Sequence, residues 1–321
     1  MLVGGMGTRL RPLTVSVPKQ MLPVGGRPMI EHVVEHLAAH GVDEVVLALG
    51  FRPDAFRSAY PDGRCCGVRL RYALEPEPLD TAGAVAFAAA HAGVDDTFVV
   101  CNGDVLTDLD VTSLVAFHRR RGALATIHLT AVEDPSAFGV VPTDDTGRVL
   151  AFVEKPPAGE APTNLVNGGT YVVEPEVLER VPAGRRVSIE RETFPDLVAS
   201  GRLYGLASPA SWLDAGTPAT YLAANLRHAG RVPSPVGVEP GAFVEGSVVA
   251  ADARVAAGAR VRRSVLMAGA RVGVDAVVVD SILGPGAEVG EGAELTELCV
   301  LGAGVRVAPG EQLAGARLPG P

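Results

Sequence analysis

The chain has 321 residues, of which 47% are hydrophobic and 20% charged, and its formal net charge is −9. This composition is typical of a soluble globular protein with a sizeable core, and the length allows two domains. No apolar run approaches the roughly 18 residues that span a bilayer, nothing at the start resembles a signal peptide, and the negative charge argues against nucleic acid as the main partner. A small anionic substrate would therefore need a locally basic pocket.

The first part of the chain alternates between strand and helix patterns. Strands are predicted at 44–50, 68–74 and 97–104, and helices at 28–40, 53–60, 81–92 and 112–121. This alternation favours a mostly parallel sheet covered on both faces, in the Rossmann-like α/β class. Ligands of such sheets bind beyond the carboxyl ends of the strands, where the loops at 4–23 and 101–104 fall.

The strands that follow lie closer together in the sequence. They are predicted near 125–132, 138–142, 149–154 and 167–173, and helices at about 188–200 and 217–228 complete this part of the chain. Such short connections leave no room for crossover helices, so we expect a mixed sheet with an antiparallel extension.

Beyond a Gly- and Pro-rich linker at 229–237 the pattern becomes a repeat. Aliphatic residues recur about every six positions, with two steps of five, at Phe243, Val249, Val255, Val261, Leu266, Val272, Val278, Leu283, Val289, Leu295, Leu301, Val307 and Leu313. Small residues lie between them. This hexapeptide period is typical of a left-handed β-helix. We therefore expect an α/β domain at 1–230, a linker at 231–237 and a β-helix at 238–321.

The four cysteines, Cys65, Cys66, Cys101 and Cys299, form no metal-ligand or disulfide framework. The adjacent pair Cys65 and Cys66 would be strained as a disulfide. The sequence therefore predicts reduced thiols and a cytoplasmic protein.

The opening loop "GGMGTRLRPLTVSVPKQ" has the composition of a phosphate-binding loop. Glycines 4, 5 and 7 let the backbone approach a bulky anion, and Thr8 and Arg9 add donors. It is neither a Walker loop nor a dinucleotide fingerprint, because it lacks GxxxxGK[ST] and has Leu10 where the third glycine of GxGxxG would be. An ordinary glycine turn is the alternative. Arg9, Arg11 and Lys19 nearby favour the phosphate interpretation.

Lysine is rare in this chain. Of the 28 Lys and Arg residues, only Lys19 and Lys155 are lysines, and each lies next to a proline. Lysine is a compact point charge on a flexible stem, whereas arginine is a planar fork. Both positions therefore suggest sites where the planar guanidinium group of arginine does not fit. The alternative is that the two lysines remain by chance on a solvated surface.

Two aspartates are candidate ligands of Mg²⁺. Asp104 follows an apolar strand in "CNGDVL", and Asp214 follows the only tryptophan in "SWLDAGTP". Mg²⁺ prefers one or two carboxylates together with phosphate oxygens. A helix cap or turn is the alternative role for each aspartate. The zinc-like pattern "HVVEH" at 32–36 is rejected, because its histidines fall on the solvated side of an amphipathic helix.

Together these segments resemble the sugar-1-phosphate nucleotidyltransferase family, and within it most closely the mannose-1-phosphate guanylyltransferases. The stretch "GGMGTRLRPLTVSVPKQMLPVGGRPM" resembles the family's signature loop, and the family's order continues with "EPEPLDTAGAV", "CNGDVL", "FGVV", "FVEKP", "NLVNGGTYV", "SIERETFP" and "WLDAGTP". Longer members also end in a hexapeptide β-helix, so the resemblance spans nearly the whole chain.

The resemblance implies a nucleoside triphosphate site. Arg9 would hold the triphosphate and Lys19 would contact the phosphates around the reacting phosphorus, which makes both the expected catalytic cations. Glu75 matches a position that faces the base. The nucleotide-binding residues implied in this way are Gly4, Gly5, Gly7, Thr8, Arg9, Glu75, Thr81, Ala82 and Asp104.

The resemblance also implies a sugar-phosphate site and a metal. Glu154 would hold sugar hydroxyls and Lys155 the sugar phosphate, while Gly139 and Asn167 would line the sugar pocket. Asp104 and Asp214 match the family's metal-binding aspartates, so Mg²⁺ is the expected cofactor.

The implied reaction is attack of a hexose 1-phosphate on the α-phosphorus of a nucleoside triphosphate, with pyrophosphate leaving. A carboxylate at Glu75 can accept from both guanine N1–H and the 2-amino group, which favours GTP, with mannose 1-phosphate as partner. The alternatives are a glucose-1-phosphate thymidylyl- or uridylyltransferase and a non-catalytic regulatory subunit on the same fold. An acyltransferase on the β-helix is disfavoured, because the last histidine, His228, precedes the repeats.

Two departures from the family pattern stand out. Asp80 occupies a position where the family usually has glycine, and only Met1, Leu2 and Val3 precede the loop, whereas strands commonly have 5–6 residues. The β-helix is expected to cap the first domain or to mediate self-association, so a homo-oligomer is the expected assembly.

Overall fold

The computed structural model describes residues 1–50, 53–229 and 237–319. The chain divides into two compact units, the first formed by Met1–Gly5 and Glu31–Trp212 and the second by Met6–Ile30 and Leu213–Pro321. The opening loop is thus divided between the units, which the sequence did not indicate. The predicted linker at 231–237 lies outside the described residues except for Gly237, so its boundaries stay a prediction.

The first half of unit 1 is the predicted α/β alternation. Strand β3 (Glu44–Leu49) runs parallel to β5 (Val68–Leu74), and the short β4 (Arg64–Cys65) pairs antiparallel with β5. Helix α1 (Met29–Ala39) precedes β3, α2 (Pro53–Ala59) lies between β3 and β4, and α3 (Asp80–Ala92) follows β5. Helix α3 packs on β3 and β5 through its alanines, and it ends where Gly93 takes φ +68°.

The short N-terminal segment fills the place of a central strand. Leu2 forms parallel bridges to Ala48 on one side and to Asn102 on the other. The terminal ammonium group of Met1 donates to the Val46 carbonyl at 2.8 Å, and burial lowers the pKa of this group. Three residues therefore link β3 to the strand that ends before Asn102.

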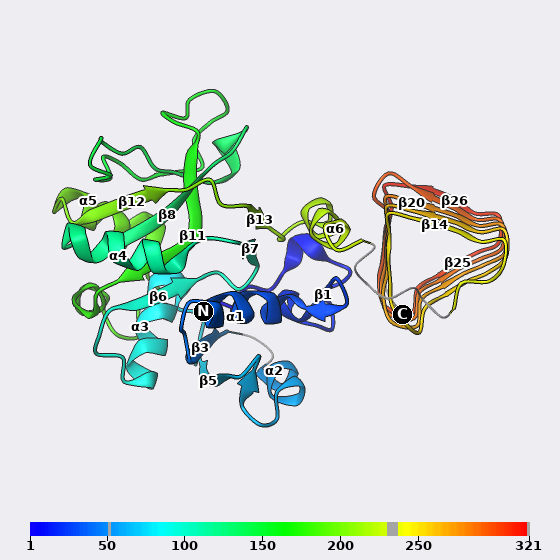
Figure 1. The fold of residues 1–321 in the computed structure, drawn as a ribbon, viewed down its shortest axis with the longest axis horizontal. Helices are drawn as coiled ribbons and strands as arrows, with labels where there is room; N and C mark the ends of the chain where they lie inside the picture. The colour runs from blue at the N-terminus through cyan, green and yellow to red at the C-terminus, as the bar shows by residue number, and fades with distance from the viewer. Residues whose placement is uncertain (51–52, 230–236, 320–321) are drawn as a thin grey trace. The chain divides into compact units, whose positions relative to one another are not determined.

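The second half of unit 1 is the antiparallel extension that the strand spacing predicted (Figure 1). Strand β11 (Leu165–Val173) runs antiparallel to β6 (Phe98–Cys101) and to β8 (Ala125–Ala131), and β12 (Leu203–Ala207) is parallel to β8. The sequence did not predict β12. Two-residue strands β9 (Gly139–Val140) and β10 (Val153–Glu154) pair at the edge. The sheet is therefore mixed, as expected for this class.

Helices cover the extension and enclose its core. Helix α4 (Val111–Arg121) begins at Asp110, whose side chain accepts from the Ser113 amide, and α5 (Phe194–Ala199) follows a π-helical turn, η5 (Ile189–Thr193). The fully buried rings of Tyr171 and Phe194 lie 5.2 Å apart at the centre of this core. The remaining short elements are β7 (Val105–Thr107), β13 (Trp212–Asp214), η3 (Pro135–Ala137) and η4 (Pro175–Arg180).

The first part of unit 2 is built around helix α6 (Pro218–Leu226), which a Thr217 capping box begins. The hydroxyl of Tyr221 donates to the Pro23 carbonyl, and the Gly25 amide donates to Asn225 Oδ1 at 3.0 Å. These bonds fix the hairpin of β1 (Pro23–Val24) and β2 (Arg27–Pro28) on the helix. The 3₁₀ turns η1 (Thr8–Leu10) and η2 (Lys19–Met21) precede the hairpin.

The rest of unit 2 is the predicted β-helix, a three-sided coil of parallel strands (Figure 1). Its first sheet contains β14 (Phe243–Glu245), β17 (Arg260–Arg262), β20 (Val277–Val279), β23 (Glu294–Thr296) and β26 (Gln312–Ala314). The second contains β15 (Val248–Val249), β18 (Val265–Leu266), β21 (Ile282–Leu283), β24 (Val300–Leu301) and β27 (Arg317–Leu318). The third contains β16 (Arg254–Val255), β19 (Arg271–Val272), β22 (Glu288–Val289) and β25 (Arg306–Val307).

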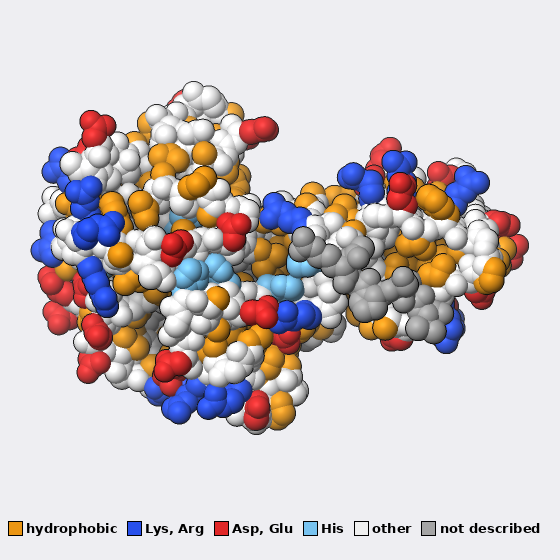
Figure 2. Space-filling view, in the orientation of Figure 1, with side chains coloured by type: hydrophobic (Ala, Val, Ile, Leu, Met, Phe, Trp, Pro, Cys, Tyr) orange, Lys and Arg blue, Asp and Glu red, His pale blue; other side chains and the backbone are white. Residues whose placement is uncertain are grey.

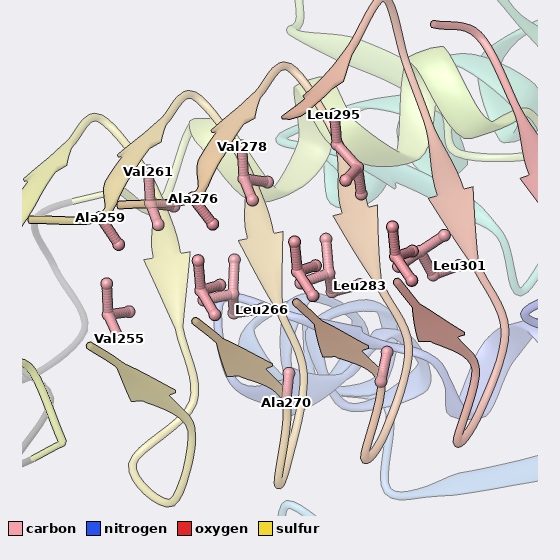
Figure 3. Packing of buried hydrophobic residues seen from close by; sticks show 14 of the residues in the cluster. Val255, Ala259, Val261, Leu266, Ala270, Ala276, Val278, Leu283, Leu295 and Leu301 are labelled. Atoms are coloured by element: carbon pink, nitrogen blue, oxygen red, sulfur yellow. The ribbon is translucent and has the colours of Figure 1, made fainter. Parts of the chain in front are cut away.

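The repeating residues from Val249 onward stack inside this coil (Figure 3). Phe243 does not, because it is exposed and its neighbour Val244 occupies the inward position opposite Val261. Val261 pairs in register with Val278, and Leu266 with Leu283, so each side chain meets its equivalent one coil away. The two five-residue steps correspond to corners at which Arg263 and Asp280 adopt φ near +47°. The aliphatic period therefore predicts both the coil and its corners.

The outside of the β-helix carries basic and acidic side chains side by side (Figure 2). Arg262 Nε lies 3.3 Å from Glu245 Oε2, and Arg306 Nε lies 3.1 Å from Glu288 Oε2. Each pair joins two neighbouring strands of one sheet. Such exposed pairs contribute little stability, so the buried aliphatic stack is the main stabilising element. No helix in the described ranges has the length and apolar character needed to cross a membrane.

Candidate active site

In unit 1, the loops that follow the parallel strands converge at one edge of the sheet. A side chain at Gly4 would lie 3.2 Å from the Gly50 amide nitrogen and 3.4 Å from Glu75 Oε1, so a larger residue would fit here only tightly. The other Glu75 oxygen, Oε2, accepts from the Leu79 amide at 2.9 Å. Glu75 thus shapes its own loop with one oxygen and presents the other beside Gly4. The neighbouring Gly5 is exposed.

Asp104 lies at the same edge, after strand β6. The Gly103 amide donates to the Leu2 carbonyl at 3.0 Å, which ties this loop to the N-terminal segment. Asp104 is buried, with only 7% of the residue exposed. A carboxylate this buried must be paired with hydrogen-bond donors or with a cation.

The start of helix α3 shows why Asp80 is unusual. Its φ is +60°, a left-handed conformation that glycine adopts without strain, and its carboxylate accepts from the Thr81 amide at 2.8 Å. The Thr81 hydroxyl donates to Glu190 at 2.7 Å and accepts from the Ile189 amide. Ala82 is 2% exposed and its amide donates to Val187. In this geometry Thr81 and Ala82 also hold the loop in place.

The expected sugar-phosphate residues lie together on β9 and β10. Gly139 pairs with Glu154, and a side chain at Gly139 would lie 3.2 Å from Glu154 Oε2 and against the Phe152 ring. Lys155 Nζ lies 2.9 Å from Glu154 Oε1, and its φ of +50° is strained for lysine. A carboxylate and an ammonium group therefore stand side by side above a glycine.

Asn167 joins this group through Tyr171. Asn167 Nδ2 donates to the Tyr171 hydroxyl at 2.9 Å, and Asn167 Oδ1 accepts from the Gly169 amide. Burial, and after it the charges of Glu190 and Glu154, raise the pKa of Tyr171. Glu154 is thus close enough to Tyr171 to act on it. The structure brings Gly139, Glu154, Lys155 and Asn167 to one place in unit 1.

In unit 2, Gly7 and Lys19 lie against each other. Gly7 has φ +60°, and a side chain there would lie 3.0 Å from Thr14 Cγ2 and 3.4 Å from Lys19 Cβ. The Thr14 hydroxyl donates to the Gly7 carbonyl at 2.7 Å. The loop therefore folds back so that Lys19 lies beside its glycine, while Thr8 is exposed.

Arg9 and Asp214 also meet within unit 2. Arg9 Nη2 lies 4.0 Å from Asp214 Oδ2, and the Gly216 amide donates to Asp214 Oδ1 at 2.7 Å. A side chain at Gly216 would clash with both, at 2.6 Å from Arg9 Nη2 and 2.7 Å from Asp214 Oδ1. A larger residue at Gly216 would therefore displace the ends of the Arg9 and Asp214 side chains.

One polar residue beside Lys19 escaped the sequence reasoning. Gln20 is fully buried, and neither its amide nitrogen nor its amide oxygen has a hydrogen-bond partner among the described residues. A buried amide without partners costs free energy unless something satisfies it. The only feature of the sequence that could have indicated its burial is its position between Lys19 and the apolar Met21 and Leu22.

The donor set fits Mg²⁺ better than a transition metal. Asp104 in unit 1 and Asp214 in unit 2 each carry carboxylate oxygens, the hard ligands that Mg²⁺ takes in small number beside phosphate. Among the described residues, no group of three or more His, Cys, Asp or Glu side chains could hold a metal by itself. In the rejected zinc pattern Glu35 is exposed, but His36 is half-buried with its ring 5.0 Å from that of His40. His36 therefore does not lie on the solvated side as expected.

The four cysteines form no disulfide, as the sequence indicated. Cys65 Sγ and Cys66 Sγ lie 3.9 Å apart, and burial raises the pKa of Cys65 to about 12. Cys65 is therefore a protonated thiol at neutral pH.

Comparison with known proteins gives the family. The nucleotidyl transferase family matches residues 1–230, and the family described as the GMPPB C-terminal domain matches residues 231–318. A mannose-1-phosphate guanylyltransferase of Mycobacterium tuberculosis is 42% identical over 273 residues, which are 79% of this chain and 75% of that protein. A mannose-1-phosphate guanyltransferase of Emericella nidulans is 43% identical over 225 residues, which are 69% of this chain and 61% of that protein.

A solved structure also matches most of the chain. HddC from Yersinia pseudotuberculosis, also solved in complex with GMP-PN, matches with a TM-score of 0.61 and 27% sequence identity. The match covers 70% of this chain and 96% of that chain.

Proposed function

The chain belongs to the nucleotidyl transferase family, and we propose that it transfers a guanylyl group from GTP to mannose 1-phosphate, giving GDP-mannose and pyrophosphate. Nucleotidyl transfer itself follows from the family. The two substrates are the proposal, and they are supported by the names of the relatives that are 42% and 43% identical.

The observation that carries the proposal is the group of Glu154, Lys155 and Asn167 in unit 1. A sugar phosphate needs acceptors and donors for its hydroxyls and a cation for its phosphate. Glu154 and Asn167 provide the first and Lys155 the second. The φ of +50° at Lys155 is a local strain of the kind that is kept where a side chain must be aimed.

The reaction requires two anions to approach each other. The phosphate oxygen of the sugar forms a bond to the α-phosphorus of the nucleotide, and the bond from this phosphorus to the β-phosphate oxygen breaks, so that pyrophosphate leaves with the electron pair. Lys155 would neutralise the sugar phosphate, and Arg9 and Lys19 the triphosphate. Such a transfer depends on positioning and charge more than on a covalent nucleophile.

Asp104 and Asp214 are the residues that would hold Mg²⁺. When bound, the ion supplies neutralisation of charge on the phosphate oxygens during the transfer. Arg9, 4.0 Å from Asp214, would be released towards the triphosphate when the carboxylate is engaged elsewhere.

Recognition of guanine is assigned to Glu75. One carboxylate oxygen already accepts from Leu79, and Oε1 lies beside Gly4, where a base can approach the bare backbone. A carboxylate can accept from guanine N1–H and the 2-amino group, whereas uracil and thymine present a carbonyl at the matching place. GTP is therefore the proposed nucleotide.

A matrix of four nucleoside triphosphates against mannose and glucose 1-phosphates, followed as pyrophosphate release, tests the assignment. We expect the highest kcat/KM for GTP with mannose 1-phosphate, and a lower value for GTP in Glu75→Gln. Preference for dTTP or UTP with glucose 1-phosphate would replace the substrates within the same reaction. No turnover in any combination would point to a regulatory subunit.

The family does not give location or assembly. We propose a cytoplasmic enzyme, because its thiols are reduced, and a homo-oligomer formed through the β-helix, whose end strands offer backbone groups for pairing. A monomer in light scattering at working concentration would contradict the second proposal.

A further inference from the structure

A bulge in strand β11 connects several segments of the candidate site. The register of β11 against β8 shifts between Asn167 and Tyr171, and Gly169 within the bulge has φ +74°. The Gly169 carbonyl accepts from the Asn102 amide at 2.9 Å, at the start of the loop that carries Asp104. The bulge therefore aims Asn167 and anchors the loop of Asp104.

Trp212 fixes this bulge and a second segment at once. Its indole Nε1 donates to the Gly168 carbonyl at 2.9 Å. Its ring packs edge-on against Phe138, with centroids 5.5 Å apart and planes at 76°. The Phe138 carbonyl accepts from the Lys155 amide at 3.0 Å. One side chain thus holds the backbone beside Asn167 and packs against the residue that holds Lys155.

The other side of Gly168 is closed by His128. This residue is fully buried, its Nε2 lies 2.9 Å from Ser208 Oγ, and its Nδ1 has no hydrogen-bond partner in the described part of the chain. A side chain at Gly168 would collide with the imidazole. Only glycine therefore fits between His128 and the carbonyl that the indole binds.

The chain places Trp212 itself firmly. The amide of the preceding Ser211 donates to Asp108 Oδ1 at 2.7 Å, which anchors the start of β13. Trp212 is half-buried, and its one polar group, the indole N–H, donates to the carbonyl of the bulge. Its contacts are therefore not limited to apolar packing in a core. The only tryptophan of the chain contacts two segments that carry expected sugar-phosphate residues.

We propose that Trp212 is a positioning residue for the hexose 1-phosphate: its indole N–H and ring hold Asn167 and Lys155 at the distance that the sugar and its phosphate require. This inference depends on the proposed function, since it assumes that Asn167 and Lys155 bind the sugar phosphate. Trp212 touches neither substrate in this account and acts through Gly168 and Phe138.

Trp212→Phe separates the two contacts. Phenylalanine keeps an aromatic ring beside Phe138 but cannot donate to the Gly168 carbonyl, so the bulge loses a hydrogen bond and part of its order. Loss of one such bond corresponds to about a three- to tenfold change in an equilibrium. We expect the KM of the hexose 1-phosphate to rise by about this factor, while the KM of the nucleoside triphosphate stays within about twofold.

Phe138→Leu tests the second contact, because it removes the ring edge and keeps an apolar side chain. The expected result is again a higher KM for the hexose 1-phosphate alone. Tyr204→Phe is the matched control, since its ring packs on Phe117 at the α4–β12 contact and it carries no site residue. This control should leave both KM values unchanged.

Three results would overturn the inference. One is equal loss of affinity for both substrates together with a lower melting temperature, which would indicate a purely structural tryptophan. Another is an unchanged KM for the sugar phosphate in Trp212→Phe. The third is a change only in the Mg²⁺ concentration needed for half-activation, which would assign Trp212 to Asp214 two residues later.

Failure of the proposed function looks different. If the wild-type enzyme releases no pyrophosphate with any hexose 1-phosphate, the function is wrong. If the wild type turns over and Trp212→Phe matches it in both KM values, only the positioning role is wrong.

Discussion

The β-helix and the candidate sugar-phosphate site use the same backbone conformation for different ends. In the β-helix, left-handed residues such as Arg263 and Asp280 recur at equivalent corners, and each turns the chain into the next strand. In unit 1, Asp80 and Lys155 are left-handed singly, beside residues expected to bind substrates. A strained residue that repeats is part of an architecture, whereas one that stands alone beside charged side chains points to a function.

The two regions also differ in what holds them together. The β-helix stacks equivalent aliphatic side chains that are fully buried, such as Val261, Val278 and Leu283 (Figure 3). The site in unit 1 is held by single hydrogen bonds between unlike groups, such as that from Trp212 to Gly168. Substitutions should therefore separate into those that lower stability and those that lower activity.

The largest effect is expected at the charged residues of the site. Asp104→Ala or Lys19→Ala should lower kcat/KM by at least about 100-fold, the scale of losing one preorganised electrostatic contact. Steady-state pyrophosphate release measures this. Asp252→Ala, at an exposed aspartate of the β-helix, is the control and should match the wild type. Near wild-type turnover of Asp104→Ala would remove the metal assignment.

The reverse pattern is expected in the β-helix core. Leu283 is fully buried in the stack, and Leu283→Ala should lower the free energy of unfolding by about 2–5 kcal/mol through lost contacts and a cavity. Urea denaturation followed by circular dichroism measures this change. The KM values of folded enzyme should not change; a large shift in either would show that the two regions are not separable.

A pH effect is expected from His128. Burial lowers its pKa to about 4, below the value of about 6.5 in the unfolded chain. The unfolded state therefore binds more protons between these values, so stability falls as the pH falls from 6.5 towards 4, by up to roughly 3 kcal/mol. His128→Gln should show a shallower loss of stability in urea melts at pH 7 and pH 4.5. Equal slopes would contradict a neutral buried imidazole.

The smallest effect is expected at Asp80. Glycine would relieve the left-handed strain but would lose the bond to the Thr81 amide and increase the entropy of the unfolded chain. These terms oppose each other, so Asp80→Gly should change the free energy of unfolding by less than about 1 kcal/mol. A larger loss in urea melts would give Asp80 a structural role.

Much of the fold was predictable from period and spacing. Most strands and helices of unit 1 and the aliphatic repeat could be predicted from the sequence, because each buried face leaves a regular hydrophobic pattern. Strand β12 was missed, since "LYGLA" is short and contains a glycine. The division of the opening loop between two compact units has no local signal.

The site was predictable by residue type but not by geometry. The motifs identified Glu154, Lys155 and Asn167, yet nothing in the sequence indicates that Lys155 is left-handed or that Trp212 bonds to Gly168. A positive φ at a non-glycine residue depends on its surroundings, not on its own preference. Gln20 escaped notice for a similar reason, because its burial comes from its neighbours.

The most direct test of the account is the pair of KM values of Lys155→Ala with GTP and mannose 1-phosphate as substrates. If separate cations serve the two substrates, the sugar phosphate should lose about tenfold or more in apparent affinity while GTP is bound as by the wild type. Equal weakening of both substrates, or of GTP alone, would contradict the claim that separate basic side chains hold the two reacting anions.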